Sequence, residues 1–313
     1  MHKYFVSLAL VVLSVSAQIV PEVLTNEAII KMVQSRVPAA KIISSIAAAG
    51  VAVDFRLADA DLQRLKEAKV SDAVLKAMED SLKSLRVKAD DGDSMAQFNV
   101  GLIYRDGRGV PQDYAEAARW FRKAADQGLD GAQVNLGVLY FMGQGVAQDY
   151  AEAANWYRKA ADQELDGAQL NLGLMHKKGQ GVPQDYTEAV ALFRGAANSG
   201  LPDAQFNLGL MYSEGNGVPV DLAEAVRWFR KAAEQGLVAA QINLGVLYFT
   251  GEGIAQDSVQ AYMWFDLAVS RATADDQKKF YSDGRNRIAA KMTTQQIASA
   301  QRLAREWRRK NSK

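Results

Sequence analysis

The sequence predicts an all-α protein, a solenoid of paired helices, and regular spacing is the main observation behind this. Glycine recurs every 36 residues, at Gly101, Gly137, Gly173, Gly209 and Gly245. Most of the chain between Ala96 and Val269 keeps the same register, in which two helical stretches alternate with glycine turns. A fixed period of this length is typical of repeats that bury their apolar faces only by stacking on neighbours. An array of near-identical units favours binding over chemistry.

Composition is consistent with a folded repeat protein. Hydrophobic residues make up 49% and charged residues 23% of the 313 residues, which is enough for a core. Cysteine is absent, which excludes disulfides, thiolate zinc sites and a cysteine nucleophile. The net charge of +1 conceals a division, because residues 93–270 carry 13 basic against 21 acidic side chains and residues 271–313 carry 12 against 4. The basic end is either a solvated helix face or a segment that meets an anionic surface.

The N-terminus predicts export. His2 and Lys3 precede an apolar run from Tyr4 to Val15, and Ala17 completes a small-residue cleavage pattern before Gln18. This run is too short for a membrane span, which takes about 20 residues. We therefore expect residues 1–17 to be a cleaved signal peptide and the protein to be periplasmic or secreted, with an uncleaved anchor as the alternative. No transmembrane span is expected in the mature chain.

Residues 18–92 are predicted to form a small helical module. One helix is expected to begin near Leu24, a second to run from Pro38 to Gly50, and two more to cover residues 59–68 and 71–85, with apolar residues at helical spacing. The segment resembles a short helical module of bacterial envelope proteins. That resemblance implies no activity.

From residue 93 each repeat is expected to contain a helix A, a glycine turn, a helix B and a second break. An aspartate three residues before Glu or Gln opens every helix B, at Asp113, Asp149, Asp185, Asp221 and Asp257. This spacing predicts a capping box, in which the Asp caps the helix and the Glu or Gln reaches back to the cap's own N–H. Gly128, Gly200 and Gly236 are expected to end helix B in left-handed geometry, and Glu164 to give a strained turn at the same place.

The glycine inside helix A predicts a close helix contact. Glycine there costs about 0.5 to 1 kcal/mol relative to alanine, a cost that is offset if a methyl group would clash with a neighbouring helix. A row of helix B alanines is the expected partner. Aromatic rows are expected to fill the core beside it. The alanines are Ala124, Ala160, Ala196, Ala232 and Ala268, and the aromatic rows include Trp120, Trp156, Trp228 and Trp264.

Together the patterns A-Q-x-N-L-G-x-x-Y, G-x-G-V-P-Q-D and E-A-x-x-W-F-x-K-A-A resemble the Sel-one-like repeat, a branch of the tetratricopeptide-like solenoids. Five tandem copies cover about residues 93–272. Residues 273–313 look like the usual ending of such proteins, a capping helix with Ile297, Ala300, Ala304 and Trp307 along one stripe. The resemblance implies a right-handed α-solenoid that acts as an adaptor or scaffold. Bacterial members with export signals often work in the cell envelope or outside the cell.

Catalytic sites, cofactors and metals are not expected. His176, the single histidine after Gln18, occupies the place of a tyrosine in the other repeats and is interpreted as a packing residue. The glycine turns lack the third glycine of a dinucleotide fingerprint, and no S-x-x-K nucleophile motif occurs. Nucleic acid is not an expected partner, because the array is acidic. A column of arginines at one repeat position, which could grip a polyanion, is interpreted as a solvated face with modest ion pairs, and comprises Arg122, Arg158, Arg194 and Arg230.

Partner binding is predicted at positions that vary from repeat to repeat. The residue four after the helix A glycine is Arg105, Phe141, Lys177, Ser213 or Phe249, a set that no buried pocket would accept, so both phenylalanines are expected to be exposed, with Met142 beside the first. A column of amides that never varies has two interpretations, ties between repeats or the lining of a peptide groove. It contains Gln133, Asn135, Gln169, Asn171, Gln205 and Asn207.

The predicted function is a non-catalytic scaffold that binds another protein or peptide in the bacterial envelope or outside the cell. The alternative is an envelope polysaccharide or anionic-surface binder that uses the basic C-terminal segment and the arginine column.

Overall fold

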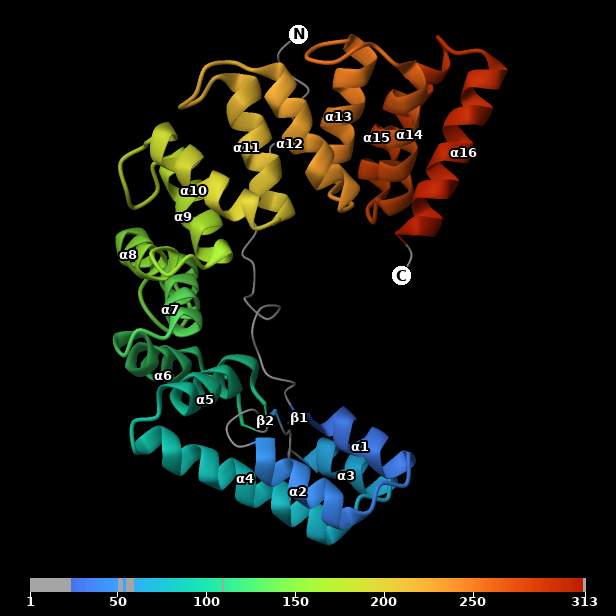
Figure 1. The fold of residues 1–313 in the computed structure, drawn as a ribbon. Helices are drawn as coiled ribbons and strands as arrows, with labels where there is room; N and C mark the ends of the chain where they lie inside the picture. Colours follow the sequence, from blue (N-terminus) through green and yellow to red (C-terminus); the bar gives the residue numbers. More distant parts are fainter. Residues whose placement is uncertain (1–23, 50–52, 55–58, 109, 312–313) are drawn as a thin grey trace. The chain divides into compact units, whose positions relative to one another are not determined.

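The computed structural model describes residues 24–49, 53–54, 59–108 and 110–311. The predicted signal peptide at residues 1–17 lies outside this part of the chain. The described residues fall into two compact units, a first unit that ends at Gln163 and a second unit that begins at Glu164. Each unit is a stack of helices (Figure 1). The domain boundaries expected at residues 92/93 and 272/273 stay predictions.

The first unit begins with the four helices that the sequence predicted. They are α1 (Asn26–Gln34), α2 (Ala39–Ala49), α3 (Asp59–Glu67) and α4 (Asp72–Asp90), and α4 runs past its expected end near residue 85. Two strands of two residues each, β1 (Leu24–Thr25) and β2 (Val53–Asp54), pair in parallel, which the sequence did not indicate. The apolar residues at helical spacing form one buried cluster, including Ile29, Ile42, Leu65 and Met78.

The repeats supply ten helices of nearly equal length. The A helices are α5 (Ser94–Asp106), α7 (Asp130–Met142), α9 (Asp166–Lys178), α11 (Pro202–Glu214) and α13 (Val238–Thr250). The B helices are α6 (Tyr114–Asp126), α8 (Tyr150–Ala161), α10 (Tyr186–Asn198), α12 (Leu222–Glu234) and α14 (Ser258–Arg271). Within each unit an A helix packs on its own B helix, and that B helix packs on the next A helix. This confirms the predicted class, an α-solenoid of five helix-turn-helix repeats.

The aspartates cap the B helices as predicted, but the second bond of the predicted capping box is not formed at Asp149. Asp149 Oδ1 accepts the Glu152 N–H at 3.0 Å, and the other four aspartates accept equivalent bonds. The expected return bond to the cap's own N–H is wrong for Asp149, whose N–H donates instead to the Tyr140 carbonyl at 3.0 Å. The backbone of the cap residue therefore also anchors the loop to helix A. Glu152 accepts the Trp156 indole N–H at 3.0 Å.

The mid-helix glycines mark a close contact, but its partner is an aromatic ring rather than an alanine. A Cβ on Gly101 would lie 2.6 Å from the ring of Phe121, and one on Gly173 or Gly209 would lie 2.7 Å from the ring of helix B in its own repeat. Real Cβ atoms do not approach so closely. The repeated glycine thus leaves room for the helix B ring against helix A, and the expected alanine partner is wrong. The rings involved are Phe121, Tyr157, Phe193, Phe229 and Phe265.

The breaks after helix B follow the prediction. Gly128, Gly200 and Gly236 have φ values of 91°, 103° and 92°. Glu164 takes the same left-handed turn with a φ of 62°, a conformation that costs a residue with a Cβ more than it costs glycine.

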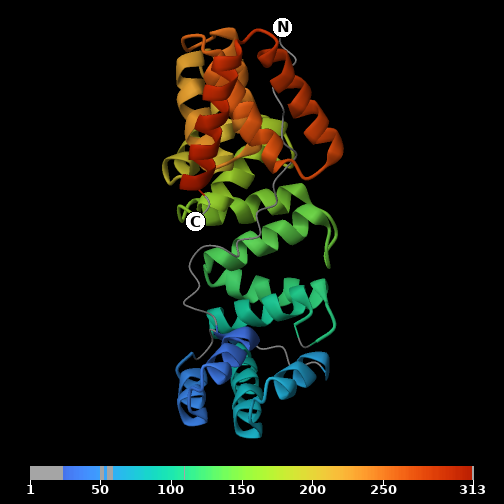
Figure 2. The same cartoon turned by 90° about the vertical axis from the view of Figure 1, so that its right-hand side faces the viewer.

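The second unit closes with α15 (Asp275–Ala289) and α16 (Thr294–Lys310), both packed on α14 (Figure 2). Asp266 on α14 joins the three helices, since its carboxylate accepts from Arg285 at 2.9 Å and from Arg308 at 3.3 Å. Ala300 and Ala304 are buried, and Trp307 meets the edge of Trp264 with ring centroids 6.4 Å apart. Among the helices of the described ranges, none has the length and apolar character that crossing a membrane requires.

Candidate partner-binding site

The five variable positions lie in the last turns of the A helices. A glutamine from the following loop holds the carbonyl of four of them, for example Gln148 Nε2 donating to Phe141 O at 2.9 Å and Gln256 Nε2 to Phe249 O at 2.7 Å. Val220 replaces this glutamine in the fourth repeat and is 63% exposed. The backbone at these positions is therefore fixed by a repeated contact, while the side chain is left to vary.

Phe141 is not exposed, which corrects the sequence expectation. Its side chain is only 9% exposed, and its ring meets Tyr150 on α8 edge-on, with centroids 5.0 Å apart. A position that holds charged residues in some repeats and aromatic residues in others therefore does not face solvent in every repeat. Met142 beside it is 47% exposed, as expected. In the first unit, then, Met142 offers the accessible apolar surface and Phe141 supports it.

Phe249 is half-buried on α13. The Lys291 ammonium lies 4.9 Å from the centre of its ring, a cation–π geometry. Phe249 also lines a pocket between α13, α14 and α15. Phe249 is thus partly exposed, as expected, but its ring lies in the wall of a cavity rather than on an open surface.

Arg105 is occupied by contacts within the first unit. It donates to Asn135 Oδ1 on α7 at 2.6 Å and to both carboxylate oxygens of Asp106, at 2.6 and 3.0 Å. Burial acts to raise the pKa of Asp106, but the contacts with Arg105 and Arg108 outweigh it and lower the pKa. Arg105 therefore ties two successive A helices together and has little capacity left for a partner.

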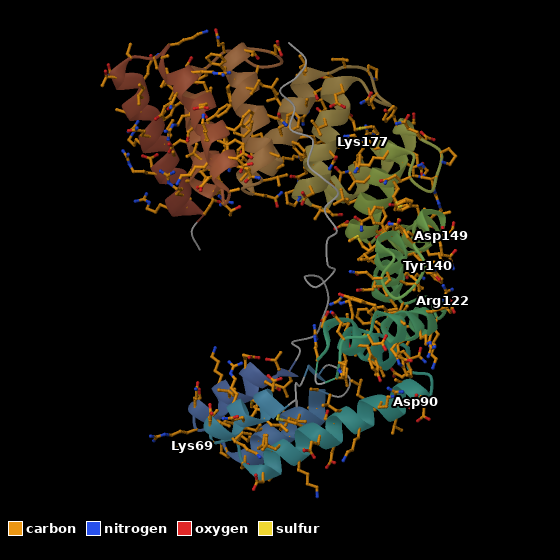
Figure 3. All side chains as sticks on the ribbon, turned by 180° about the vertical axis from the view of Figure 1, so that it is seen from behind. Lys69, Asp90, Arg122, Tyr140, Asp149 and Lys177 are labelled. Carbon is orange, nitrogen blue, oxygen red and sulfur yellow. The ribbon has the colours of Figure 1, made fainter. Side chains whose placement is uncertain are left out.

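Lys177 and Ser213 lie on successive A helices of the second unit. Lys177, labelled in Figure 3, is half-buried, and burial lowers the pKa of its ammonium, an effect that Glu214 partly opposes. Ser213 Oγ donates to the Leu210 carbonyl at 2.9 Å inside its own helix. A half-buried lysine whose charge is only partly compensated is stabilised by an added carboxylate. Lys177 is thus the variable position best suited to an acidic partner group.

The glutamine column ties repeats together, as the structural interpretation held. Gln133 Nε2 donates to the Ala125 carbonyl at 3.3 Å, and its Oε1 accepts from Gln163 at 2.9 Å. Gln205 makes the same pair of contacts with Ala197 and Gln235. Both glutamines are about 4% exposed, so neither lines an open groove. Gln169 lacks the second contact in the described structure, because Ser199 stands where the partner glutamine would be.

In the asparagine column Asn135 and Asn171 are buried and Asn207 is half-buried. Asn135 and Asn207 each donate to the carbonyl four residues earlier, Gly131 at 2.7 Å and Asp203 at 2.8 Å. Asn171 is 3% exposed and makes no hydrogen bond among the described residues. A fully enclosed amide cannot reach a peptide backbone without rearrangement.

Three arginines of the column donate to a tyrosine of the next repeat, a contact that the sequence analysis did not predict. In the first unit Arg122 on α6 donates to the Tyr140 hydroxyl on α7, and both side chains are visible in Figure 3. In the second unit Arg194 and Arg230 donate to Tyr212 and Tyr248, at 2.8 and 2.9 Å. The constant spacing of 18 residues between Arg and Tyr was the available signal. These arginines join adjacent repeats, so the ion pairs expected four residues along each helix are not their main contacts.

His176 is 7% exposed and lies in the A helix α9, consistent with a packing residue. Across the described ranges no group of three or more His, Asp or Glu side chains is placed to hold a metal ion.

These features define a helical repeat protein whose repeated residues build the stack and whose variable residues lie at the ends of the A helices. The model of the Sel1 repeat family matches residues 94–129, 131–165, 167–201, 202–237 and 238–272. The chain belongs to the Sel1 repeat family. Proteins of this family are generally protein-interaction scaffolds.

Solved structures of other bacterial proteins are similar to this chain. A Sel1 repeat protein from Oxalobacter formigenes is 30% identical, with a TM-score of 0.61 over 67% of this chain and 93% of that one. A protective antigen of uropathogenic Escherichia coli that displays an SLR fold is 28% identical over 74% of this chain and 72% of its own, with a TM-score of 0.37. The immunity protein Pa5087 of Pseudomonas aeruginosa is 21% identical over 63% and 83%, with a TM-score of 0.38. No curated protein matches.

Proposed function

We propose that this chain is a non-catalytic scaffold of the bacterial envelope or extracellular space, which binds another protein or peptide at the ends of its A helices. One observation carries the proposal. The residues that repeat contact one another inside the stack, whereas the side chains at the end of helix A differ in type from repeat to repeat. Met142 and Lys178 occupy the same position in successive repeats, and both are exposed. Lys177, next to Lys178, is a half-buried cation.

Site-specific photo-crosslinking tests the surface. Benzoylphenylalanine is introduced at Met142 in the first unit and at Lys178 in the second. The matched controls are Arg119 on α6 and Arg227 on α12, whose side chains are 74% and 73% exposed. We expect the same partner to be crosslinked from positions 142 and 178 and not from the two controls. Equal crosslinking from B helix controls would contradict binding at the A helix ends.

Export is part of the proposal and has its own test. The apolar run before Gln18 supports a cleaved signal. Subcellular fractionation with N-terminal sequencing should find the protein in the envelope or culture medium, beginning at Gln18. A cytoplasmic protein that begins at Met1 would overturn the location without affecting the binding surface.

A further inference from the structure

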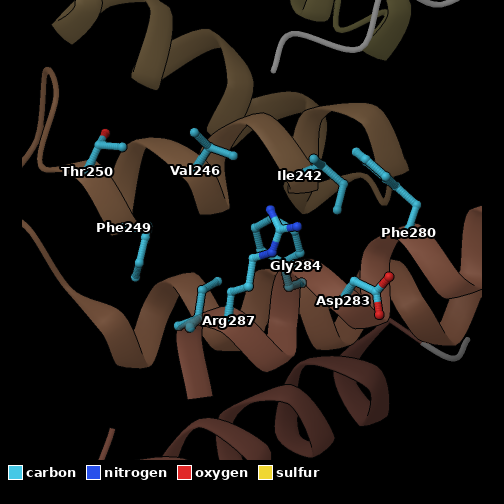
Figure 4. Close-up of a pocket in the computed structure, with 10 residues that line it drawn as sticks. Ile242, Val246, Phe249, Thr250, Phe280, Asp283, Gly284 and Arg287 are labelled. Atoms are coloured by element: carbon cyan, nitrogen blue, oxygen red, sulfur yellow. The ribbon is translucent and has the colours of Figure 1, made fainter. Parts of the chain in front are cut away.

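A pocket of about 300 Å³ lies between α13, α14 and α15 in the second unit. Its walls are mostly apolar, and they include Ile242, Val246, Phe249, Phe280 and Ile288 (Figure 4). Phe280, a large apolar side chain of this lining, is 54% exposed. The volume is at the lower end for a ligand site and fits one or two bulky side chains.

The pocket is held open by the way in which α15 packs. Phe265 on α14 lies between two glycines, since a Cβ on Gly245 of α13 would lie 2.8 Å from its ring and one on Gly284 of α15 would overlap it. Both neighbouring helices therefore approach the same ring. The ion pair between Arg285 and Asp266 fixes α15 on α14 at 2.9 Å. Walls fixed in this way make a preformed cavity rather than a loose gap, which reduces the entropy cost of binding.

The charge at the rim is positive. Arg287 extends from α15 into the middle of the pocket in Figure 4, and it makes no ion pair or hydrogen bond among the described residues. Lys291, one turn further on, lies against the ring of Phe249. Asp283 is the acid at this rim, and it already pairs with Lys279 at 3.0 Å. An apolar cavity beside two cations, neither of which forms an ion pair among the described residues, complements a group that is apolar at one end and anionic at the other.

We infer that this pocket binds a peptide segment in which a bulky apolar side chain is followed by acidic residues. The apolar side chain enters between Val246 and Phe280, and the carboxylates meet Arg287 and Lys291. The inference rests on the proposed function, because it names the class of protein segment that the scaffold takes. It places one anchor of the partner at the fifth repeat, and the remaining surface then supplies further contacts.

Fluorescence polarisation with four labelled hexapeptides tests this pocket. The acidic probe is Ser-Leu-Phe-Glu-Glu-Ser, the neutral and basic probes carry Gln or Lys in place of both Glu, and the fourth has Ser in place of Leu and Phe. We expect the acidic probe to bind about fivefold more tightly than the neutral one, as two partly exposed ion pairs imply. The basic probe and the probe without Leu and Phe should bind at least tenfold more weakly than the acidic one.

Variants then assign the binding to this cavity. Arg287→Gln together with Lys291→Gln should remove the preference for the acidic probe and leave the neutral probe unchanged. Phe280→Ser should weaken both probes about tenfold. Arg302→Gln on α16 and Val220→Ser in the fourth repeat are the matched controls, exposed and away from the pocket. Controls that weaken binding as much as the pocket variants would overturn the inference.

Two other occupants are distinguished in the same experiment. Binding of laurate without binding of any peptide would assign the pocket to a fatty acid and overturn the inference. A concentration-dependent dimer that Phe280→Ser abolishes would assign it to a second copy of this chain, also against the inference. If the probes fail while crosslinks from position 178 persist, the pocket assignment falls and the scaffold function stands. Loss of those crosslinks would remove the function itself.

Discussion

The second and fifth repeats carry the same five residues, Gly-Val-Leu-Tyr-Phe, at 137–141 and 245–249, yet the final phenylalanine has a different environment in each. Phe141 is covered edge-on by Tyr150. In the fifth repeat Ser258 stands where Tyr150 would be, and Phe249 remains half-buried at the wall of a pocket. The role of an identical segment is therefore decided by a residue nine positions later, at the start of helix B.

The largest effect should come from removing the two phenylalanines. Phe141→Ala should lower the free energy of unfolding by about 3 kcal/mol, because it leaves a cavity beside Tyr150. Phe249→Ala should cost about 1 kcal/mol, since that ring is already partly solvated. Urea unfolding followed by circular dichroism measures both. Equal losses would mean that the two rings are packed alike and would break the comparison.

Exchanging the neighbouring residue should transfer the environment. Tyr150→Ser should destabilise the protein by about 1 to 2 kcal/mol and expose Phe141, and a double-mutant cycle with Phe141→Leu should show coupling of about 1 kcal/mol for the aromatic pair. The matched cycle, Ser258→Ala with Phe249→Leu, should show coupling close to zero. Absence of coupling in the first cycle would show that Tyr150 is not what covers Phe141.

The helix caps should behave alike in both repeats. Asp149→Ala and Asp257→Ala each remove a side chain that accepts backbone N–H groups at the start of helix B, so each should cost about 1 kcal/mol. Asn at either position should restore most of the loss, because it keeps the accepting oxygen. Thermal melts of the four variants measure this. If only one of the two Ala variants were destabilised, the repeated aspartates would not be equivalent, and the two repeats would differ in their caps as well as in their phenylalanines.

The 36-residue repeat explains which features of the fold could be predicted from the sequence. Helix order, the aspartate caps and the left-handed turn at Glu164 follow from patterns local to a few residues, and all three are present. The partner of the mid-helix glycine was missed because an alanine row and an aromatic row share the same helix B. Only the packing angle decides that the ring of Phe121, rather than the methyl of Ala124, meets Gly101.

The candidate site was harder to predict because its environment depends on residues outside the repeat position. Comparing Tyr150 with Ser258 would have indicated that Phe141 and Phe249 differ. The pocket beside Phe249 needs α15, which lies beyond the repeats and brings Gly284 against Phe265. No periodic signal in the array predicts that contact. The ends of a repeat protein are therefore where sequence comparison among its own repeats is least informative.

The smallest predicted effect is on the pH dependence of stability, which should differ between variants of Lys177 in the second unit and Arg105 in the first. Burial lowers the pKa of Lys177, so between its lowered pKa and the ordinary value of 10.5 the unfolded chain binds more protons than the folded one. The free energy of unfolding therefore increases with pH in this range, because deprotonation of Lys177 favours the folded state. Lys177→Gln should remove this rise, which is measured as the difference in Tm between variant and parent from pH 7 to pH 10.

Arg105→Gln is the control for this titration. Its guanidinium keeps its proton throughout the range and is paired with Asp106, so the variant should lower Tm by the same amount at every pH from 7 to 10. A parallel offset in both variants would mean that Lys177 stays fully protonated in the folded protein over this range. The cation at the end of α9 would then be compensated within the protein, as Arg105 is, and would have no greater need of an acidic partner.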